Sequence, residues 1–192
     1  MKTQELQREA LAGHMNAGFT TLNAFKRTKS LETSAWYMAS LTTYLVEKKD
    51  VNGEFALIEA LLVPGNEPPP HVHSREDELY YILEGEFDVY AGHEGFNVKS
   101  GECIFLPRLE PHAFVIRSAR LRVLLMISPA GLEAAFRSMA SPALKLELPT
   151  GMPTYATSDL THTIEVFKDY GITLLSPEEI ATQLPSYRQP LP

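Results

Sequence analysis

Two histidines separated by a single residue, His71 and His73, are the part of this sequence best suited to chemistry. Residues i and i+2 of a strand point to the same face, so both imidazoles project together and can share one metal ion. Glu78 follows five residues after His73, and His112 comes directly after Pro111 at the start of a later apolar run. The spacing predicts a metal centre with four protein ligands, which are His71, His73, Glu78 and His112.

Three imidazoles and one carboxylate suit several divalent transition metals, namely Ni, Fe, Zn, Mn, Co or Cu, and these residue types do not choose among them. Four protein ligands on a six-coordinate ion leave positions for water, O2 or substrate, as a catalytic site requires. Glu76, Asp77 and Glu78 alone would indicate a solvated acidic turn, and only the spacing selects Glu78. With a turn at 74–77, we expect Glu78 to return beside the histidines from the neighbouring strand. The other histidines, interpreted as surface or hydrogen-bonded side chains, are His14, His93 and His162.

The composition is that of a soluble globular protein, with 44% apolar and 21% charged residues in a chain of 192. The formal net charge is -7 and no stripe of Lys or Arg stands out, so we expect no nucleic-acid partner. No apolar stretch approaches the roughly 18 residues that a membrane-spanning helix needs, so no membrane association is expected. A cytoplasmic location is predicted, because the first ten residues lack the apolar segment of a signal peptide and the single Cys103 permits no intrachain disulfide. Cys103 lies in an apolar run and is predicted to be buried.

Residues 35–128 show the pattern of a β-domain. Short apolar runs, each bounded by Pro, Gly or charged residues, recur without a helical period between them, which is typical of an antiparallel sandwich or barrel. One copy of this block predicts one barrel rather than two. The runs span residues 55–63, 79–83, 87–91, 103–106, 112–117 and 121–127.

The two flanks of the β-domain have other patterns. Residues 1–34 are predicted to form an N-terminal arm, with a helix over 3–15 and an extended remainder. Residues 129–192 are predicted to form a helical extension that packs on the barrel. Its three helices are expected to be capped by Ser128, Ser158 and Ser176, the last in a capping box with Glu179.

Two motifs in the β-domain resemble those of a known family, the cupin superfamily. The pattern Gly65-x5-His71-x-His73-x4-Glu78-x6-Gly85 matches the first cupin motif at every named position. The pattern Gly101-x5-Pro107-x-Leu109-x2-His112-x3-Ile116 resembles the second, with Leu109 in place of its second Gly and Ile116 in place of its Asn. The resemblance covers roughly residues 50–130. It implies an all-β fold, the jelly-roll or RmlC-like double-stranded β-helix barrel, here with flanking N- and C-terminal helices.

Within the superfamily, the chain looks like the bacterial quercetin 2,3-dioxygenase-like single-domain cupins. The segments 68–73, 76–85, 105–108 and 128–133 carry this similarity. It implies a dioxygenase that cleaves a flavonol-like or other enolisable small molecule with O2. Glu78 would then be both a metal ligand and the general base that takes the substrate's hydroxyl proton. Tyr80 and Phe114, which share faces with Glu78 and His112, are predicted to line the substrate pocket.

Other functions stay open at this point. A different metal-dependent cupin enzyme, such as an isomerase, a decarboxylase or a hydrolase, fits the same ligand set, because a fold does not fix a function. A non-catalytic cupin that binds a small molecule also fits. Cupin barrels commonly pair through their sheets, so a homodimer is predicted.

Overall fold

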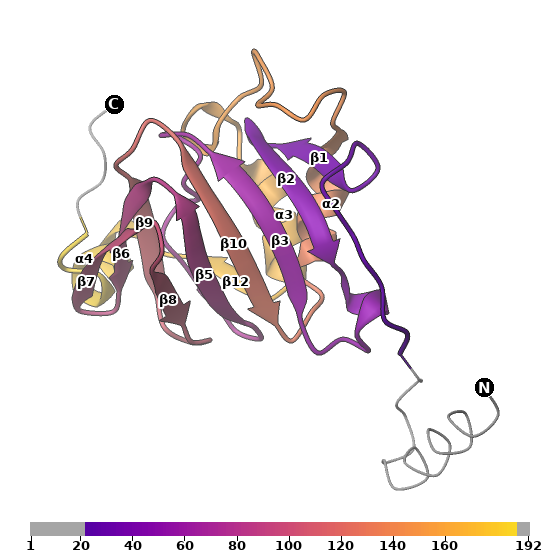
Figure 1. Cartoon of the computed structure of the whole chain (residues 1–192). Coiled ribbons are helices and arrows are strands. Elements are labelled where there is room, and N and C mark those ends of the chain that lie inside the picture. Colours follow the sequence, from indigo (N-terminus) through magenta and orange to yellow (C-terminus); the bar gives the residue numbers. More distant parts are fainter. Residues whose placement is uncertain (1–21, 188–192) are drawn as a thin grey trace, which may run out of the picture.

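A computed structural model describes residues 22–187, and within that range twelve strands form two antiparallel sheets (Figure 1). The seven-stranded sheet has the order β11-β1-β2-β3-β10-β5-β8, and the five-stranded sheet has the order β12-β4-β9-β6-β7. The strands are β1 (Ser34–Tyr37), β2 (Ser40–Val46), β3 (Ala56–Leu62), β4 (His71–His73), β5 (Asp77–Glu84), β6 (Glu86–Ala91), β7 (Glu94–Lys99), β8 (Cys103–Leu106), β9 (His112–Ile116), β10 (Leu121–Ser128), β11 (Ser141–Pro142) and β12 (Ile172–Leu174). The helical elements are η1 (Lys48–Asp50), α2 (Glu133–Met139), η2 (Tyr155–Thr157), α3 (Thr161–Asp169) and α4 (Pro177–Gln183).

Alternation along the strands decides which side chains fill the interior. In β5, Glu78, Tyr80 and Ile82 are buried, whereas Tyr81 on the opposite face is exposed. β10 alternates in the same way along its full length. The interior between the two sheets is closed by side chains from both, including Phe87 of β6 with 1% of its surface exposed. The predicted all-β cupin jelly-roll fold is confirmed.

The predicted runs agree closely with observed strands, but β1, β2 and the polar β7 were not among them. Residues 103–106 form β8 with the predicted bounds, and the runs at 55–63 and 121–127 become β3 and β10. β7 carries the sequence EGFNVK, in which only Val98 is buried. A strand at the edge of a sheet with one buried side chain has no alternation that a sequence pattern would show.

The helix predictions in the C-terminal part were wrong in their starting points. Ser128 does not cap α2, because it is the last residue of β10 and its hydroxyl donates to the carbonyl of Glu54. α2 begins at Glu133, whose side chain accepts from the amide of Gly131. The sheet therefore uses the residue that the pattern assigned to the helix cap.

The second of these helices also begins later than predicted, whereas the third agrees. α3 begins at Thr161, and its first amide is bonded by Asp159 rather than by Ser158. α4 has the predicted capping box of Ser176 and Glu179. Within the described residues, none of the helices is long and apolar enough to cross a membrane.

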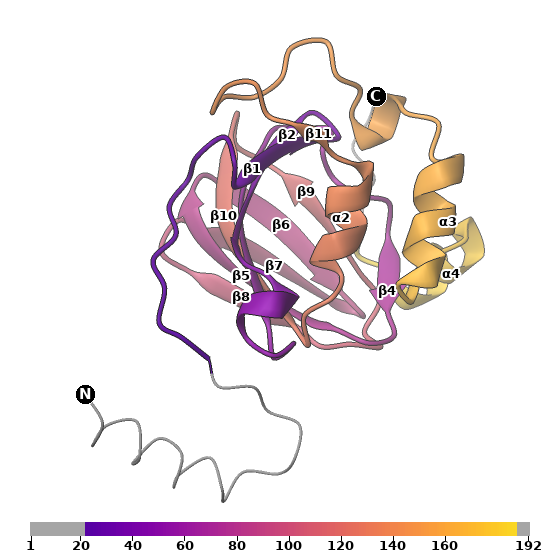
Figure 2. The same cartoon turned by 90° about the vertical axis from the view of Figure 1, so that its right-hand side faces the viewer.

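The C-terminal segments cover one side of the barrel near β4 (Figure 2). α2 and α3 pack against each other, with the rings of Phe136 and Phe167 6.4 Å apart. β12 pairs with β4 and so extends the five-stranded sheet, which the sequence did not predict. The helix predicted over 3–15 lies outside the described residues, and the division at residues 34 and 128 stays a prediction.

Cys103 was predicted to be buried, and this is wrong because it is exposed on β8. Alternation in this four-residue strand turns Ile104 and Leu106 inward, and therefore Cys103 and Phe105 outward. A short, uniformly apolar run does not show which of its two faces is buried.

Leu109 has a φ of 67°, in the left-handed region, at the position where the cupin motif has glycine. Its amide donates to the carbonyl of His73, so this turn is tied directly to the histidine pair. A side chain costs about 1 kcal/mol in this conformation, and a glycine would avoid that cost. Part of this gain in stability is lost, because glycine has a higher conformational entropy in the unfolded chain. We therefore expect Leu109→Gly to raise the free energy of unfolding by about 0.5 kcal/mol, measured by urea denaturation.

A matched control for this substitution is Leu144→Gly. Leu144 is also exposed, at 78% of its surface, but it is not among the residues with positive φ. There the glycine has no strain to relieve, so we expect a small loss of stability. A Leu109→Gly variant that unfolds at a lower urea concentration than the parent would contradict the strain argument.

Candidate metal centre

The three histidines predicted as ligands lie together on the inner side of the five-stranded sheet. His71 and His73 both point inward from β4, with 6% and 2% of their surfaces exposed. His112 begins β9 and is the register partner of His71, which places it beside the pair. Their ligand nitrogens, one from each residue, all lie within 4.8 Å of one another. The structure brings these three residues together, and their role as ligands stays a prediction.

In two of the three histidines, the outer ring nitrogen is within hydrogen-bond distance of an acceptor, which orients the imidazole. Nδ1 of His71 lies 2.8 Å from the carbonyl oxygen of Pro69, and Nδ1 of His112 lies 3.0 Å from that of Glu110. A carbonyl oxygen only accepts, so Nδ1 is the protonated nitrogen in both rings. Nε2 then keeps its free lone pair, which is the state that a metal-binding imidazole needs.

Burial lowers the pKa of His71 well below its usual value, and the neighbouring His112 and His73 add to this effect. The pKa of His112 is also lowered, mainly by burial and against the attraction of Glu78. For His73, burial lowers the pKa, but Glu78 and Glu76 together outweigh it and the net shift is upward. His71 and His112 are therefore neutral at neutral pH and available to a metal.

The structure separates the three neighbouring acids that the sequence pattern left together. Asp77 points outward and forms an ion pair with Arg108, whose hydrogen bonds lower the pKa of Asp77 to about 2. Glu76 is buried behind His73, with its Oε2 atom 3.8 Å from Nδ1 of that ring. Glu78 is buried inside the barrel on the other face of β5. Only Glu78 reaches the inner side of the histidine cluster.

Glu78 was predicted to come from a strand that neighbours the histidines, and this is wrong. β4 and β5 belong to different sheets, so Glu78 faces the imidazoles from across the barrel. Its Oε2 atom lies 3.6 Å from Nε2 of His112, and its Oε1 atom lies 4.0 Å from Nε2 of His73. The turn between the strands changes sheet rather than forming a hairpin, and the spacing alone did not distinguish these two geometries.

Tyr80 lies next to Glu78 on the same face of β5 and donates a hydrogen bond of 3.1 Å to its Oε2 atom. Burial raises the pKa of Tyr80 well above its usual value, and the charge of Glu78 adds to this. The phenol therefore remains a donor at physiological pH. It holds the Oε2 atom of Glu78, which faces His112, and leaves the Oε1 atom, which faces His73, without this bond.

Buried ring nitrogens without hydrogen-bond partners indicate that the donor set fits a divalent metal ion. Among the described residues, both ring nitrogens of His73 and Nε2 of His112 are buried without a hydrogen-bond partner. Each such group costs about 1–3 kcal/mol when left unpaired. A cation bound by the Nε2 atoms would satisfy the inward-facing nitrogens, and Glu78 adds a carboxylate to balance its charge.

Glu76 is predicted to tune the centre through His73 without binding the metal. Replacing Glu76 by glutamine removes the negative charge behind Nδ1 and makes the imidazole a poorer ligand. We expect the affinity for Zn²⁺ or Ni²⁺ to fall about 10- to 100-fold, which is the usual effect of removing a partner that lies behind a metal ligand. Competition titration with a chromophoric chelator measures this, with Glu94→Gln on exposed β7 as the control. An unchanged affinity in Glu76→Gln would contradict the assigned role.

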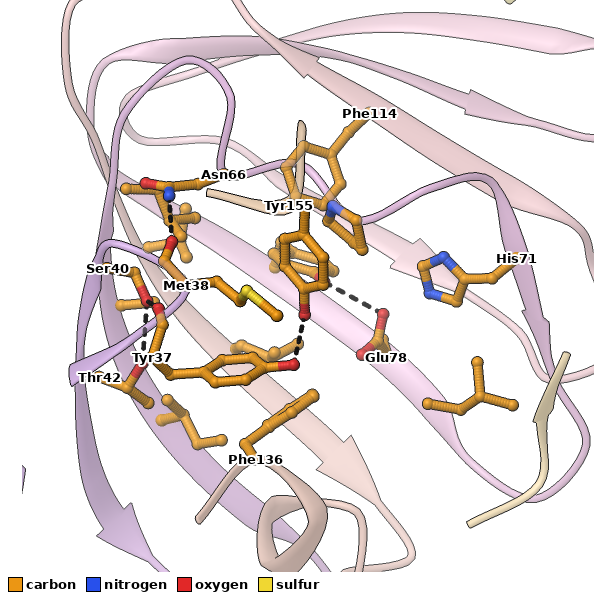
Figure 3. A pocket seen from close by; sticks show the side chains of 18 of the residues that line it. Tyr37, Met38, Ser40, Thr42, Asn66, His71, Glu78, Phe114, Phe136 and Tyr155 are labelled. Carbon is orange, nitrogen blue, oxygen red and sulfur yellow. Dashed lines mark hydrogen bonds between the residues drawn. The ribbon is translucent and has the colours of Figure 1, made fainter. Parts of the chain in front are cut away.

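A cavity opens from the centre into the barrel interior (Figure 3). Tyr80 and Phe114, the two predicted pocket residues, both lie in its wall. Their rings also pack with Phe87, at 5.9 and 5.5 Å between centroids, so they belong to the core and to the cavity at once. Their contact with a substrate stays a prediction.

Much of the cavity wall comes from outside the two cupin motifs and had no sequence signal. Tyr37 lies at the end of β1, and Phe136, Tyr155 and Phe167 belong to the C-terminal segments. The hydroxyl of Tyr155 donates to that of Tyr37 at 2.8 Å. Burial raises the pKa of Tyr37 to about 12, so this pair remains protonated. Residues so far apart in sequence meet only through the packing of the C-terminal extension.

Comparison with protein families matches residues 58–128 to the family described as "Cupin domain". The match includes the segments that carry all three histidines and Glu78. It leaves out β1 and β2 and all of the C-terminal helices, which supply part of the cavity wall.

Three known proteins illustrate what this chain is similar to. The uncharacterized protein MJ1618 of Methanocaldococcus jannaschii is 39% identical over 57 residues, which are 30% of this chain and 46% of that protein. Quercetin 2,3-dioxygenase of Bacillus subtilis is 21% identical over 95 residues, which are 50% of this chain and 28% of that protein. The crystal structure of an RmlC-like cupin from Shewanella frigidimarina superposes with a TM-score of 0.48 at 20% identity, covering 59% of this chain and 99% of that one. The chain thus spans less than half the length of both curated relatives.

Proposed function

Because this chain is a member of the cupin superfamily, we propose that it is a metal-dependent dioxygenase that cleaves a flavonol-like or other enolisable small molecule. The observation that carries the proposal is the cluster of His71, His73 and His112 facing Glu78, all buried and opening on an aromatic-lined cavity. The similarity to a quercetin 2,3-dioxygenase over half of the chain supports the reaction class.

The residues of the site have distinct roles in this proposal. His71, His73 and His112 would hold one divalent ion through Nε2, with the rings of His71 and His112 oriented from behind by their Nδ1 contacts. When bound, the metal would supply Lewis-acid stabilisation of the substrate oxyanion. Glu78 accepts the proton of the substrate's enolic hydroxyl, and Tyr80 fixes the carboxylate for this transfer. The apolar cavity wall excludes water and holds the ring of the substrate.

Oxygen uptake tests this function directly. Protein loaded separately with Fe, Ni, Co, Mn or Cu is mixed with quercetin or with maltol, a one-ring hydroxypyranone, in an oxygen-electrode cell. We expect uptake with at least one metal and none after chelation. Substrate loss under anaerobic conditions would instead favour an isomerase, decarboxylase or hydrolase. No uptake with any metal and either compound would overturn the dioxygenase assignment for enols of this type.

We also propose that the protein forms a homodimer. The outer face of the seven-stranded sheet exposes Tyr81 and Phe105, with 41% and 57% of their surfaces accessible, on the paired strands β5 and β8. Exposed apolar side chains near a sheet edge favour association, because a partner chain then covers both these side chains and the unpaired edge. Light scattering would give twice the chain mass for a dimer, and a monomeric mass would refute it. The free Cys103 suits a reducing compartment such as the cytoplasm, which stays a prediction.

A further inference from the structure

An outer groove lies behind one wall of the metal-facing cavity. Its lining includes Trp36 of β1, Met139 of α2, and Met152 and His162 from the C-terminal segments. Tyr37 and Met38 line both the groove and the cavity, and no other described residue lines both. These two adjacent residues therefore form the partition between the surface and the buried site.

The two residues of the partition are held very differently. The ring of Tyr37 packs against Phe136 and Tyr155, at 5.8 and 5.9 Å between centroids, and its hydroxyl accepts from Tyr155. The side chain of Met38 is partly buried against the hydrophobic core, and the hydroxyl of Ser158 lies 3.5 Å from its Sδ, which is a weak contact. Methionine has three rotatable side-chain bonds and a sulfur that accepts weakly. Met38 is therefore the part of the partition that can move.

The backbone at Met38 is held more firmly than its side chain. Met38 and Ala39 form the two-residue turn between β1 and β2, with φ values of 46° and 58°. Such turns favour Asn and Gly, because residues with a larger side chain are strained in this region. The buried amide of Asn66 donates to the carbonyl of Met38 and holds the turn. Figure 3 shows the Met38 side chain reaching into the cavity toward Tyr155.

The sizes of the two spaces differ in a way that bears on the ligand. The cavity of about 90 Å³ has room for roughly six to nine groups the size of a water molecule, at 10–15 Å³ each. A one-ring enol is of this size, and a three-ring flavonol is larger. The groove, at about 480 Å³, is the more spacious of the two.

We propose that Met38 is the gate and the size filter of the metal-facing cavity, through which planar aromatic enols enter from the Trp36 groove. This inference rests on the proposed function, because it takes the cavity to be the substrate site. A one-ring enol passes with a rotation of the Met38 side chain. A flavonol requires Met38 to stay displaced, with its outer ring in the groove against Trp36.

Stopped-flow fluorescence tests the gate with the full-length protein loaded with zinc, which is redox-inert and allows binding without turnover. Trp36 is the only tryptophan of the chain, so its quenching reports a ligand that passes the groove. The probes are maltol and quercetin, and the proteins are the parent, Met38→Ala and Met152→Ala. Met152 lines the groove but not the cavity, so it is the matched control.

Removal of the Met38 side chain is expected to raise the association rate of quercetin about tenfold and that of maltol less than about twofold, which lies within the range usual for variants of one site. Met152→Ala is expected to leave the ratio of the two rates unchanged. An unchanged ratio in Met38→Ala, or no quercetin binding to that variant, would overturn the gate. Zinc content measured on the same samples shows separately whether the metal site, and with it the proposed function, has failed.

Discussion

Replacing His71 and His112 together by alanine is expected to reduce the bound metal from one ion per chain to nearly none. The two residues are register partners on β4 and β9, and each presents an Nε2 atom with a free lone pair. Losing both leaves only His73 and Glu78, which are 4.0 Å apart. Elemental analysis after loading and desalting measures the difference.

The same variant is expected to lose the stabilisation that metal gives the parent. A ligand at 100 times its dissociation constant adds about 2.7 kcal/mol to the free energy of unfolding, which corresponds to roughly 5–10 °C in Tm for a chain of this size. The control is His93→Ala/His162→Ala, which removes two exposed histidines far from the cluster in sequence. Comparing each protein with and without metal separates metal binding from the packing cost of the substitutions. An equal metal-dependent rise in Tm in both double variants would contradict the site.

Replacing Glu78 by glutamine is expected to lower kcat about 10²- to 10⁴-fold while the metal content stays near one ion per chain. The amide keeps the shape of the side chain and still accepts a bond from Tyr80, but it cannot take the substrate's proton. Three histidines remain to hold the metal. Steady-state oxygen uptake and elemental analysis on the same sample give both quantities.

The control for this substitution is Glu84→Gln, which makes the same chemical change at the exposed end of β5. It is expected to keep full activity. If Glu78→Gln lost its metal together with its activity, Glu78 would be an essential ligand rather than the base. Activity within about tenfold of the parent at full metal content would exclude Glu78 as the base altogether.

The barrel and its histidines were predictable because both depend on local spacing. Alternation places His71 and His73 on one face of a strand, and the bounds of β8 follow from a single apolar run. The backbone of the cupin motif is kept even where its glycine is not, since Leu109 adopts the left-handed conformation. Sequence patterns of period two carry this information directly.

The rest of the site depends on packing between segments far apart in sequence. Nothing near Tyr155 indicates that its hydroxyl would meet that of Tyr37, and β12 is a three-residue strand whose pairing with β4 has no local signal. The acids at 76–78 were separable only when the turn between two different sheets was known. Helix starts failed for a related reason, because the sheet uses Ser128 before a helix can.

An anomalous difference map from crystals of the metal-loaded protein tests the central claim most directly, because it locates the ion without assuming any activity. One strong peak is expected among the Nε2 atoms of His71, His73 and His112, about 2.0–2.1 Å from each for a zinc ion, on the side that faces Glu78. A fully loaded protein whose peak lies elsewhere, or the absence of a peak among these three nitrogens, would contradict it.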